Sequence, residues 1–91
     1  MMEILNAYLK PLRAFMASDF YTTRKALSIT QMEMADMLDI DLRSYADLEH
    51  GASLCSTRVF LRYIFLCKKD RMQFLKDIEG VLREVDDDLL N

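Results

Sequence analysis

The chain of 91 residues is the size of one domain, and its two Gly and one Pro argue against an all-β fold or a long linker. The formal charge is −3, and no run approaches the ~20 apolar residues of a membrane span. Residues 1–9 carry an early Glu and no small-residue cleavage site, so no signal peptide is expected. Cys55 and Cys67 lack metal-ligand neighbours, which favours buried apolar side chains in a reducing compartment. These features predict a soluble, cytoplasmic protein that does not bind membranes.

The first predicted element covers residues 1–17, where apolar side chains recur at helical spacing on both sides of Pro11. Proline costs ~3 kcal/mol inside a helix but little in the first turn. We therefore predict two helical pieces, one ending near Leu9 and one beginning at Pro11, with a single kinked helix as the alternative. The apolar stripe must pack on the body or on a second subunit. It consists of Leu5, Tyr8, Leu9, Leu12, Phe15 and Met16.

The stretch from Ile29 to Gly51 predicts two short helices joined by a tight turn. Thr30 and Glu33 have the spacing of a capping box, and Asp39 is among the few residue types that tolerate a left-handed backbone at a helix end. Asp41 can cap the second helix, and Gly51 ends it. Two capped helices with a short turn make a helix-turn-helix. Its expected core residues are Met34, Ala35, Leu38, Ile40, Tyr45 and Leu48.

A run of residues through these helices carries a family resemblance. Thr-Gln-x-x-x-Ala-x-x-Leu is followed by Leu-Glu-x-Gly, and an arginine precedes both. With these residues the chain resembles the lambda-repressor-like (Cro/repressor, XRE) DNA-binding domains over about half its length, from Phe20 to Cys67. The matching residues are Arg24, Thr30, Gln31, Ala35, Leu38, Ile40, Tyr45, Leu48, Glu49, His50 and Gly51.

The resemblance implies an all-α fold: a lambda-repressor-like helix-turn-helix bundle of about five helices plus the N-terminal helical extension. The family's first helix would begin near Asp19 and end about Ser28, with Phe20, Arg24 and Leu27 pointing inward. It also implies a structural salt bridge between Arg24 and Glu49.

A helix is predicted from about Ser56 to Cys67, after a short loop. It is apolar nearly all the way round, which predicts a buried helix with Leu61 in the core. Lys68 and Lys69 suit its C-terminal end through the helix dipole.

A last helix is predicted from Asp70, which forms a capping box with Gln73, to about Asp86. Gly80 costs ~1 kcal/mol in a helix relative to Ala, so it is expected to mark a close helix–helix approach. The acidic end of the chain predicts a solvated, frayed tail. The apolar stripe of the helix is Leu75, Ile78, Leu82 and Val85, widened by Phe74 and Val81.

Catalysis is not expected. The chain has one His, no Gly-rich phosphate loop, no Cys/His ligand set and no nucleophile beside a base. We therefore predict no enzyme, no metal site and no cofactor.

The resemblance implies that the second helix of the motif, residues 42–50, lies in the DNA major groove. Arg43 is the strongest candidate for reading bases, because a guanidinium grips guanine O6 and N7 with two bonds. Gln31 matches the family's phosphate anchor at the start of the first motif helix. His50 adds a backbone contact, with Lys25 and Arg58 as further candidates. The residues matching the base-contacting positions are Leu42, Arg43, Ser44 and Asp47.

The charge of the motif favours an alternative. Residues 30–50 hold six acids against Arg43 alone, a net charge of −5, whereas DNA affinity depends mainly on phosphate neutralisation. Met32, Met37 and Leu42 form a possible apolar patch on the same surface, which is typical of a protein partner, although Met37 can also belong to the core. The alternative is a protein-interaction module such as an anti-repressor, an antitoxin or a phage-type inhibitor.

We divide the chain into an N-terminal helical extension (1–18), a helix-turn-helix core domain (19–69) and a C-terminal helix with an acidic tail (70–91). Together these carry more apolar surface than one small body can bury. A homodimer built on the terminal helices is therefore expected. Its two-fold symmetry would place two recognition helices ~34 Å apart on a palindromic operator in double-stranded DNA.

Overall fold

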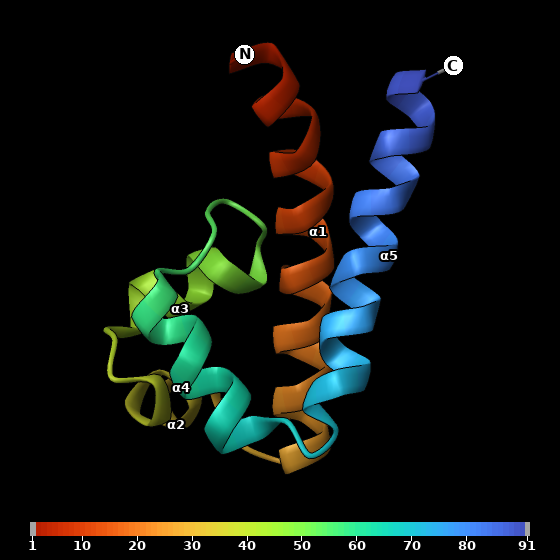
Figure 1. Cartoon of the computed structure of the whole chain (residues 1–91). Coiled ribbons are helices and arrows are strands. Elements are labelled where there is room, and N and C mark those ends of the chain that lie inside the picture. The colour runs from red at the N-terminus through yellow and green to blue at the C-terminus, as the bar shows by residue number, and fades with distance from the viewer. Residues whose placement is uncertain (1, 91) are drawn as a thin grey trace.

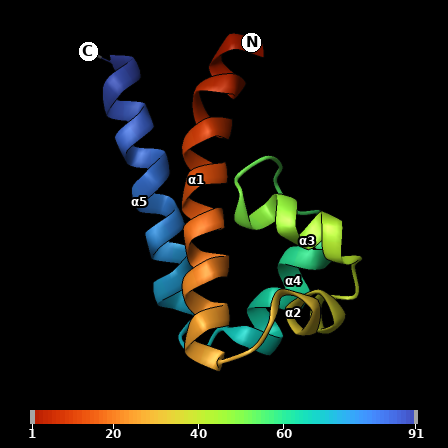
Figure 2. The same cartoon turned by 180° about the vertical axis from the view of Figure 1, so that it is seen from behind.

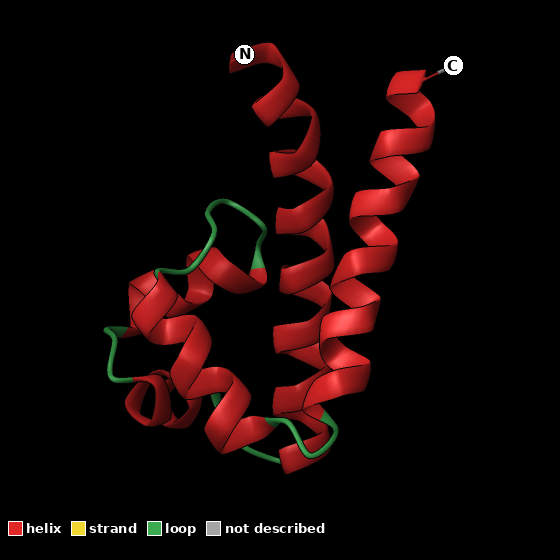
Figure 3. Ribbon diagram, viewed as in Figure 1, coloured by secondary structure: helices red, strands yellow, loops and turns green. Residues whose placement is uncertain are grey.

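The computed structural model describes residues 2–90, which form five α-helices and no strand (Figure 3). This confirms the all-α prediction. Within that range, none of the helices combines the length and apolar character that a bilayer crossing requires. The helices are α1 (Met2–Leu27), α2 (Gln31–Leu38), α3 (Leu42–Glu49), α4 (Thr57–Cys67) and α5 (Arg71–Leu90).

The two long helices, α1 and α5, lie side by side and run antiparallel, so both ends of the described chain are at the same end of the molecule (Figure 1). The three short helices gather beside the C-terminal half of α1, on the side away from α5 (Figure 2). The first part of α1 and the last part of α5 consequently extend beyond the short helices as a two-helix arm.

The predicted break at Pro11 is wrong, because α1 is one continuous helix through this residue. Proline removes one main-chain hydrogen bond from the helix, but α5 packs against α1 on both sides of it. The Tyr8 hydroxyl donates to the Asp86 carboxylate, and the Phe15 ring stacks on Phe74 with centroids 6.1 Å apart. The predicted N-terminal extension and the first helix of the motif are therefore a single element.

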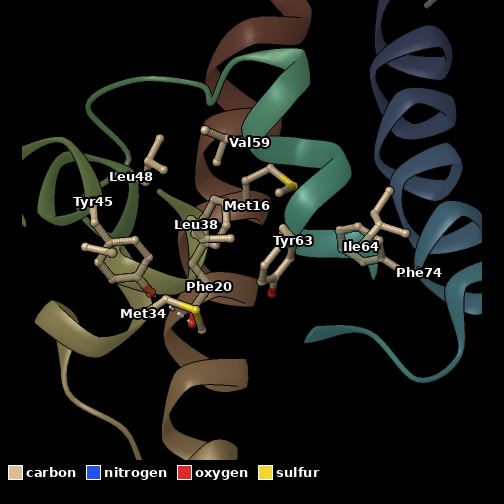
Figure 4. Close-up of a cluster of buried hydrophobic side chains, with 11 residues drawn as sticks. Met16, Phe20, Met34, Leu38, Tyr45, Leu48, Val59, Tyr63, Ile64 and Phe74 are labelled. Carbon is tan, nitrogen blue, oxygen red and sulfur yellow. Dashed lines mark hydrogen bonds between the residues drawn. The ribbon is translucent and has the colours of Figure 1, made fainter. Parts of the chain in front are cut away.

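The hydrophobic core lies where all five helices meet (Figure 4). Phe20 is fully buried at the centre of the core. Its ring centroid lies 4.5 Å from that of Tyr63 and 6.0 Å from that of Tyr45. Such aromatic pairs add specific contacts to the burial of apolar area. Of the core predicted for the motif, Ile40 is only partly buried, and the other five residues are buried: Met34, Ala35, Leu38, Tyr45 and Leu48.

The prediction that α4 is buried on every side is wrong. Its inner face, with Val59, Tyr63 and Ile64, contributes to the core, whereas Leu61 is 48% exposed and Phe65 is exposed as well. A helix in a body this small meets neighbours on one face, so the apolar side chains on its other face stay exposed. Leu27 was expected to point inward and is also exposed.

Polar side chains attach the end of α4 to α1. The Tyr63 hydroxyl hydrogen-bonds with the carboxylate of Asp19 and the hydroxyl of Thr23, and the Lys68 ammonium lies 3.0 Å from Asp19 Oδ2. Burial, with the bond to Asp19, raises the pKa of Tyr63, which stays a neutral donor. The end of α4 is thus held by direction-specific bonds as well as by packing.

The last helix differs from its prediction in three respects. Asp70 accepts from the Gln73 backbone N–H at 3.0 Å, but the Gln73 side chain donates to Asp77, so the reciprocal half of the capping box is missing. The helix continues to Leu90 instead of ending near residue 86. A Cβ added at Gly80 would meet no atom within 4 Å, so no close helix approach occurs there within residues 2–90.

Candidate nucleic-acid interface

The two helices of the motif begin and end with the predicted caps. The Thr30 hydroxyl accepts from the Glu33 N–H at 3.1 Å, and the Glu33 carboxylate accepts from the Thr30 N–H at 3.0 Å. Asp39 has a left-handed backbone with φ 58°, and Asp41 accepts from the Ser44 N–H at 2.7 Å. Gly51 is left-handed as well, with φ 72°. These local bonds define the turn that places α3 on the surface.

A buried ion pair connects the end of α1 with the end of α3. Arg24 Nε lies 2.6 Å from Glu49 Oε2, Arg24 Nη2 donates to Glu49 Oε1 at 3.1 Å, and the two side chains are only 10% and 6% exposed. Arg24 Nη1 also donates to the carbonyl oxygen of Ile29. The structure therefore contains the predicted salt bridge, which also attaches the segment leading into α2.

Gln31 belongs to the same cluster. Its side-chain amide donates to Glu49 Oε1 at 3.1 Å, so one of its N–H groups is directed at the ion pair and is not free for a ligand. Burial would raise the pKa of Glu49, but the hydrogen bonds from Arg24 and Gln31 outweigh it and lower the pKa. Glu49 in turn raises the pKa of Arg24. Both members of the pair are thus held in their charged forms.

Two arginines of α4 hold the turn between α2 and α3. The Arg62 guanidinium donates to the carbonyl oxygen of Met37 from Nη2 at 3.0 Å and from Nε at 3.3 Å. Arg58 pairs with Asp39, so this candidate phosphate contact already has a partner. This role of Arg62 was not predicted from the sequence. Its spacing of four residues from Arg58 on an otherwise apolar helix was the available signal.

The outer side of α3 presents the predicted base-contacting residues. Leu42 is 42% exposed, and Arg43 is exposed without a side-chain hydrogen bond or ion pair to any residue between 2 and 90. Ser44 is exposed too, but its hydroxyl donates to Asp41 at 2.9 Å. His50 caps the end of the helix, with Nδ1 2.8 Å from the carbonyl oxygen of Ala46. Arg43 is therefore the freest polar side chain near the start of α3.

Most of the negative charge in the motif has a structural role. Within the described chain, only Asp36 and Asp47 among its six acids make no side-chain hydrogen bond or ion pair. Counting the two arginines outside the motif that pair with it changes its formal charge from −5 to −3. The four acids that do make such bonds are Glu33 and Asp41 in helix caps, Asp39 with Arg58, and Glu49 with Arg24.

The apolar residues of the motif surface differ in exposure. Met32 is 59% exposed and, like Leu42, stands on the surface, whereas Met37 is partly buried. Between residues 2 and 90, no group of three or more His, Cys, Asp or Glu side chains is placed to hold a metal ion.

No protein-family model, no curated protein and no solved structure matches this chain.

Proposed function

We propose that the chain is a sequence-specific DNA-binding transcriptional regulator of the XRE/repressor type, which reads the major groove with α3. The observation that supports this most is the two-sidedness of α3. Tyr45 and Leu48 are buried on its inner side, while Leu42, Arg43 and Asp47 are exposed on its outer side. A reading helix needs this combination, because base contacts require side chains held on a rigid element.

The roles of the residues follow from their chemistry. Arg43 donates two hydrogen bonds to guanine O6 and N7, and Asp47 accepts from a cytosine amino group. Leu42 contacts a thymine methyl group. Ser44, Gln31 and His50 contribute backbone or base contacts, which for Ser44 and Gln31 compete with the bonds to Asp41 and Glu49.

The proposal includes a homodimer on a palindromic operator. The end of the two-helix arm exposes apolar side chains on both helices, among them Ile4 and Leu5 on α1 and Leu89 and Leu90 on α5. Each helix of the arm can turn only one face to the other, which leaves these apolar side chains exposed, so a second copy is the partner we propose.

The experiment is a selection of bound sequences from a random pool of double-stranded DNA at low salt. We expect enrichment of a palindrome with two half-sites about one helical turn apart. The Arg43→Ala variant should lose preference at one base pair in each half-site, and Arg83→Ala, a substitution on α5, should not. A parent protein that is folded by circular dichroism but enriches no sequence would contradict the proposal.

A second candidate, a protein-interaction module, is favoured by one observation. Met32 and Leu42 are exposed on the same motif that carries the exposed acids Asp36 and Asp47. An apolar surface with acidic residues suits a basic protein partner better than a phosphate backbone. If the chain is a protein-interaction module, the parent should enrich no DNA sequence in the selection. Weak, salt-dependent binding to DNA of any sequence would not support sequence-specific recognition.

A further inference from the structure

A pocket of about 240 Å³ lies between α1, α5 and the segment that leads from α3 into α4. The loop after α3 passes beside α1 at this level (Figure 1). The pocket is therefore lined by α1 and α5, the two terminal helices, and by the segment between α3 and α4 with the start of α4. Its lining consists of Leu12, Met16, Leu54, Cys55, Ser56, Thr57, Phe60 and Ile78.

The chemistry of the lining is apolar and uncharged. None of the lining side chains is Asp, Glu, Lys, Arg or His, and the polar members are Ser56 and Thr57 at the start of α4. Burial raises the pKa of the Cys55 thiol, so this group is a neutral, weakly polar part of the wall. A charged ligand would lose its hydration here without gaining an ionic partner.

We propose that this pocket binds a small, uncharged ring compound of about ten non-hydrogen atoms. The size follows from volume, because an apolar cavity of ~150 Å³ holds benzene, which has six carbons, and the present volume is larger in proportion to about ten atoms. The pocket is open to solvent on one side, and an apolar depression with a few polar groups at its edge is a common form of small-molecule site. Thr57 and Ser56 supply that edge; the Ser56 hydroxyl already accepts from the Val59 backbone N–H at 3.2 Å, so the polar edge suits a ligand with a single hydrogen-bonding group, such as an indole or a phenol.

This site goes beyond the proposed DNA binding and does not depend on it. A ligand here would contact Leu54 and Cys55 in the loop after α3 together with Leu12 on α1 and Ile78 on α5. It would therefore tie the loop to both long helices and stabilise the folded state by mass action.

The test uses the two thiols of the chain, with indole as the probe. Cys55 lines the pocket and Cys67 does not; both are half-buried, and burial raises the pKa of both. The alkylation rate of each thiol by iodoacetamide is measured by peptide mass spectrometry while indole is titrated. We expect saturable protection of Cys55, reaching about 10-fold at ten times the dissociation constant, with the rate at Cys67 unchanged.

A filled pocket provides the second arm. Ile78→Trp places a large side chain in the cavity, and the matched control Leu75→Trp makes the same kind of change on the same helix, outside the lining. Indole should no longer protect Cys55 in the first variant and should protect it fully in the control. If Ile78→Trp is unfolded by circular dichroism, Leu12→Phe fills the pocket from the opposite wall.

Two results would overturn the inference. Equal protection of both thiols in the folded Ile78→Trp variant as well as in the Leu75→Trp control would mean that indole acts on global opening and not on the pocket. Protection of Cys55 that persists in a folded, filled variant would place the ligand elsewhere. Neither result bears on DNA selection by the parent, so the two proposals fail separately.

Discussion

Arg24 and Glu49 join the end of α1 to the end of α3 through two hydrogen bonds, of 2.6 and 3.1 Å, in a mostly buried setting. Removing one partner leaves the other charge buried without compensation, which typically costs ~3–5 kcal/mol. We expect Arg24→Ala and Glu49→Ala each to lower the free energy of unfolding by about that amount in urea denaturation. The control is Arg83→Ala, which breaks an exposed pair with Glu79 and should change stability by less than ~1 kcal/mol. An Arg24→Ala variant as stable as the parent would refute the structural role of the pair.

The same pair predicts a loss of stability in acid. The pKa of Glu49 is held below its usual 4.5 in the folded state, so the unfolded state binds a proton first as the pH falls. Its contribution is fully present above pH 4.5 and is lost as the pH falls through the folded-state pKa. We expect the urea concentration at the unfolding midpoint of the parent to decrease as the pH is lowered below 4.5. The decrease should be smaller in Glu49→Gln. A residual decrease should remain, because hydrogen bonds in the helix caps also lower the pKa of Glu33 and Asp41.

The two glycines should respond to alanine with opposite signs. Gly80 lies inside α5 with free space where a Cβ would be, so Gly80→Ala should stabilise the protein by ~1 kcal/mol through helix propensity. Gly51 has φ 72°, and an alanine in this left-handed conformation should lose ~1–2 kcal/mol. Thermal denaturation of the two single variants measures both effects. If Gly80→Ala destabilises a concentrated sample and stabilises a dilute one, a second copy approaches α5 at Gly80.

The DNA-binding proposal predicts a specific loss for Arg43→Ala. A bidentate contact to guanine contributes ~1–3 kcal/mol of discrimination, so affinity for the selected operator should fall ~5- to 150-fold. Binding isotherms at two salt concentrations separate this effect from the loss of a phosphate contact, which would weaken all sequences alike. Equal affinity of parent and variant for the operator would remove Arg43 from the reading surface.

The dimer proposal predicts a mass of twice 10.7 kDa by sedimentation equilibrium at tens of micromolar. Leu5→Ser with Leu89→Ser removes two exposed apolar side chains from the arm and should shift the protein towards monomer without unfolding it. The control is Leu42→Ser, an exposed apolar residue on α3, which should leave the mass unchanged. A monomer in the parent would end this proposal.

The sequence alone determined the parts of the motif that depend on neighbours along the chain. The Thr30–Glu33 box, the left-handed Asp39, the Asp41 cap and Gly51 are where they were predicted. Each of these features is a single residue's dihedral angle or a bond between residues three positions apart, so local propensity decides them. The buried Arg24–Glu49 pair joins distant residues, and it was predicted from the family resemblance instead.

Which helix faces meet depends on contacts between residues far apart in the sequence. The energetic penalty of Pro11 did not break α1, because α5 packs against both of its halves, and no pattern within residues 1–17 contains that neighbour. Packing partners that are distant in sequence also explain why Leu61 is exposed and why the Gln31 side chain donates to Glu49. The folded path of the chain selects such partners from positions far apart in sequence. Local pattern therefore predicts which segments are helical, whereas packing decides whether a helix continues through Pro11 and what each of its sides touches.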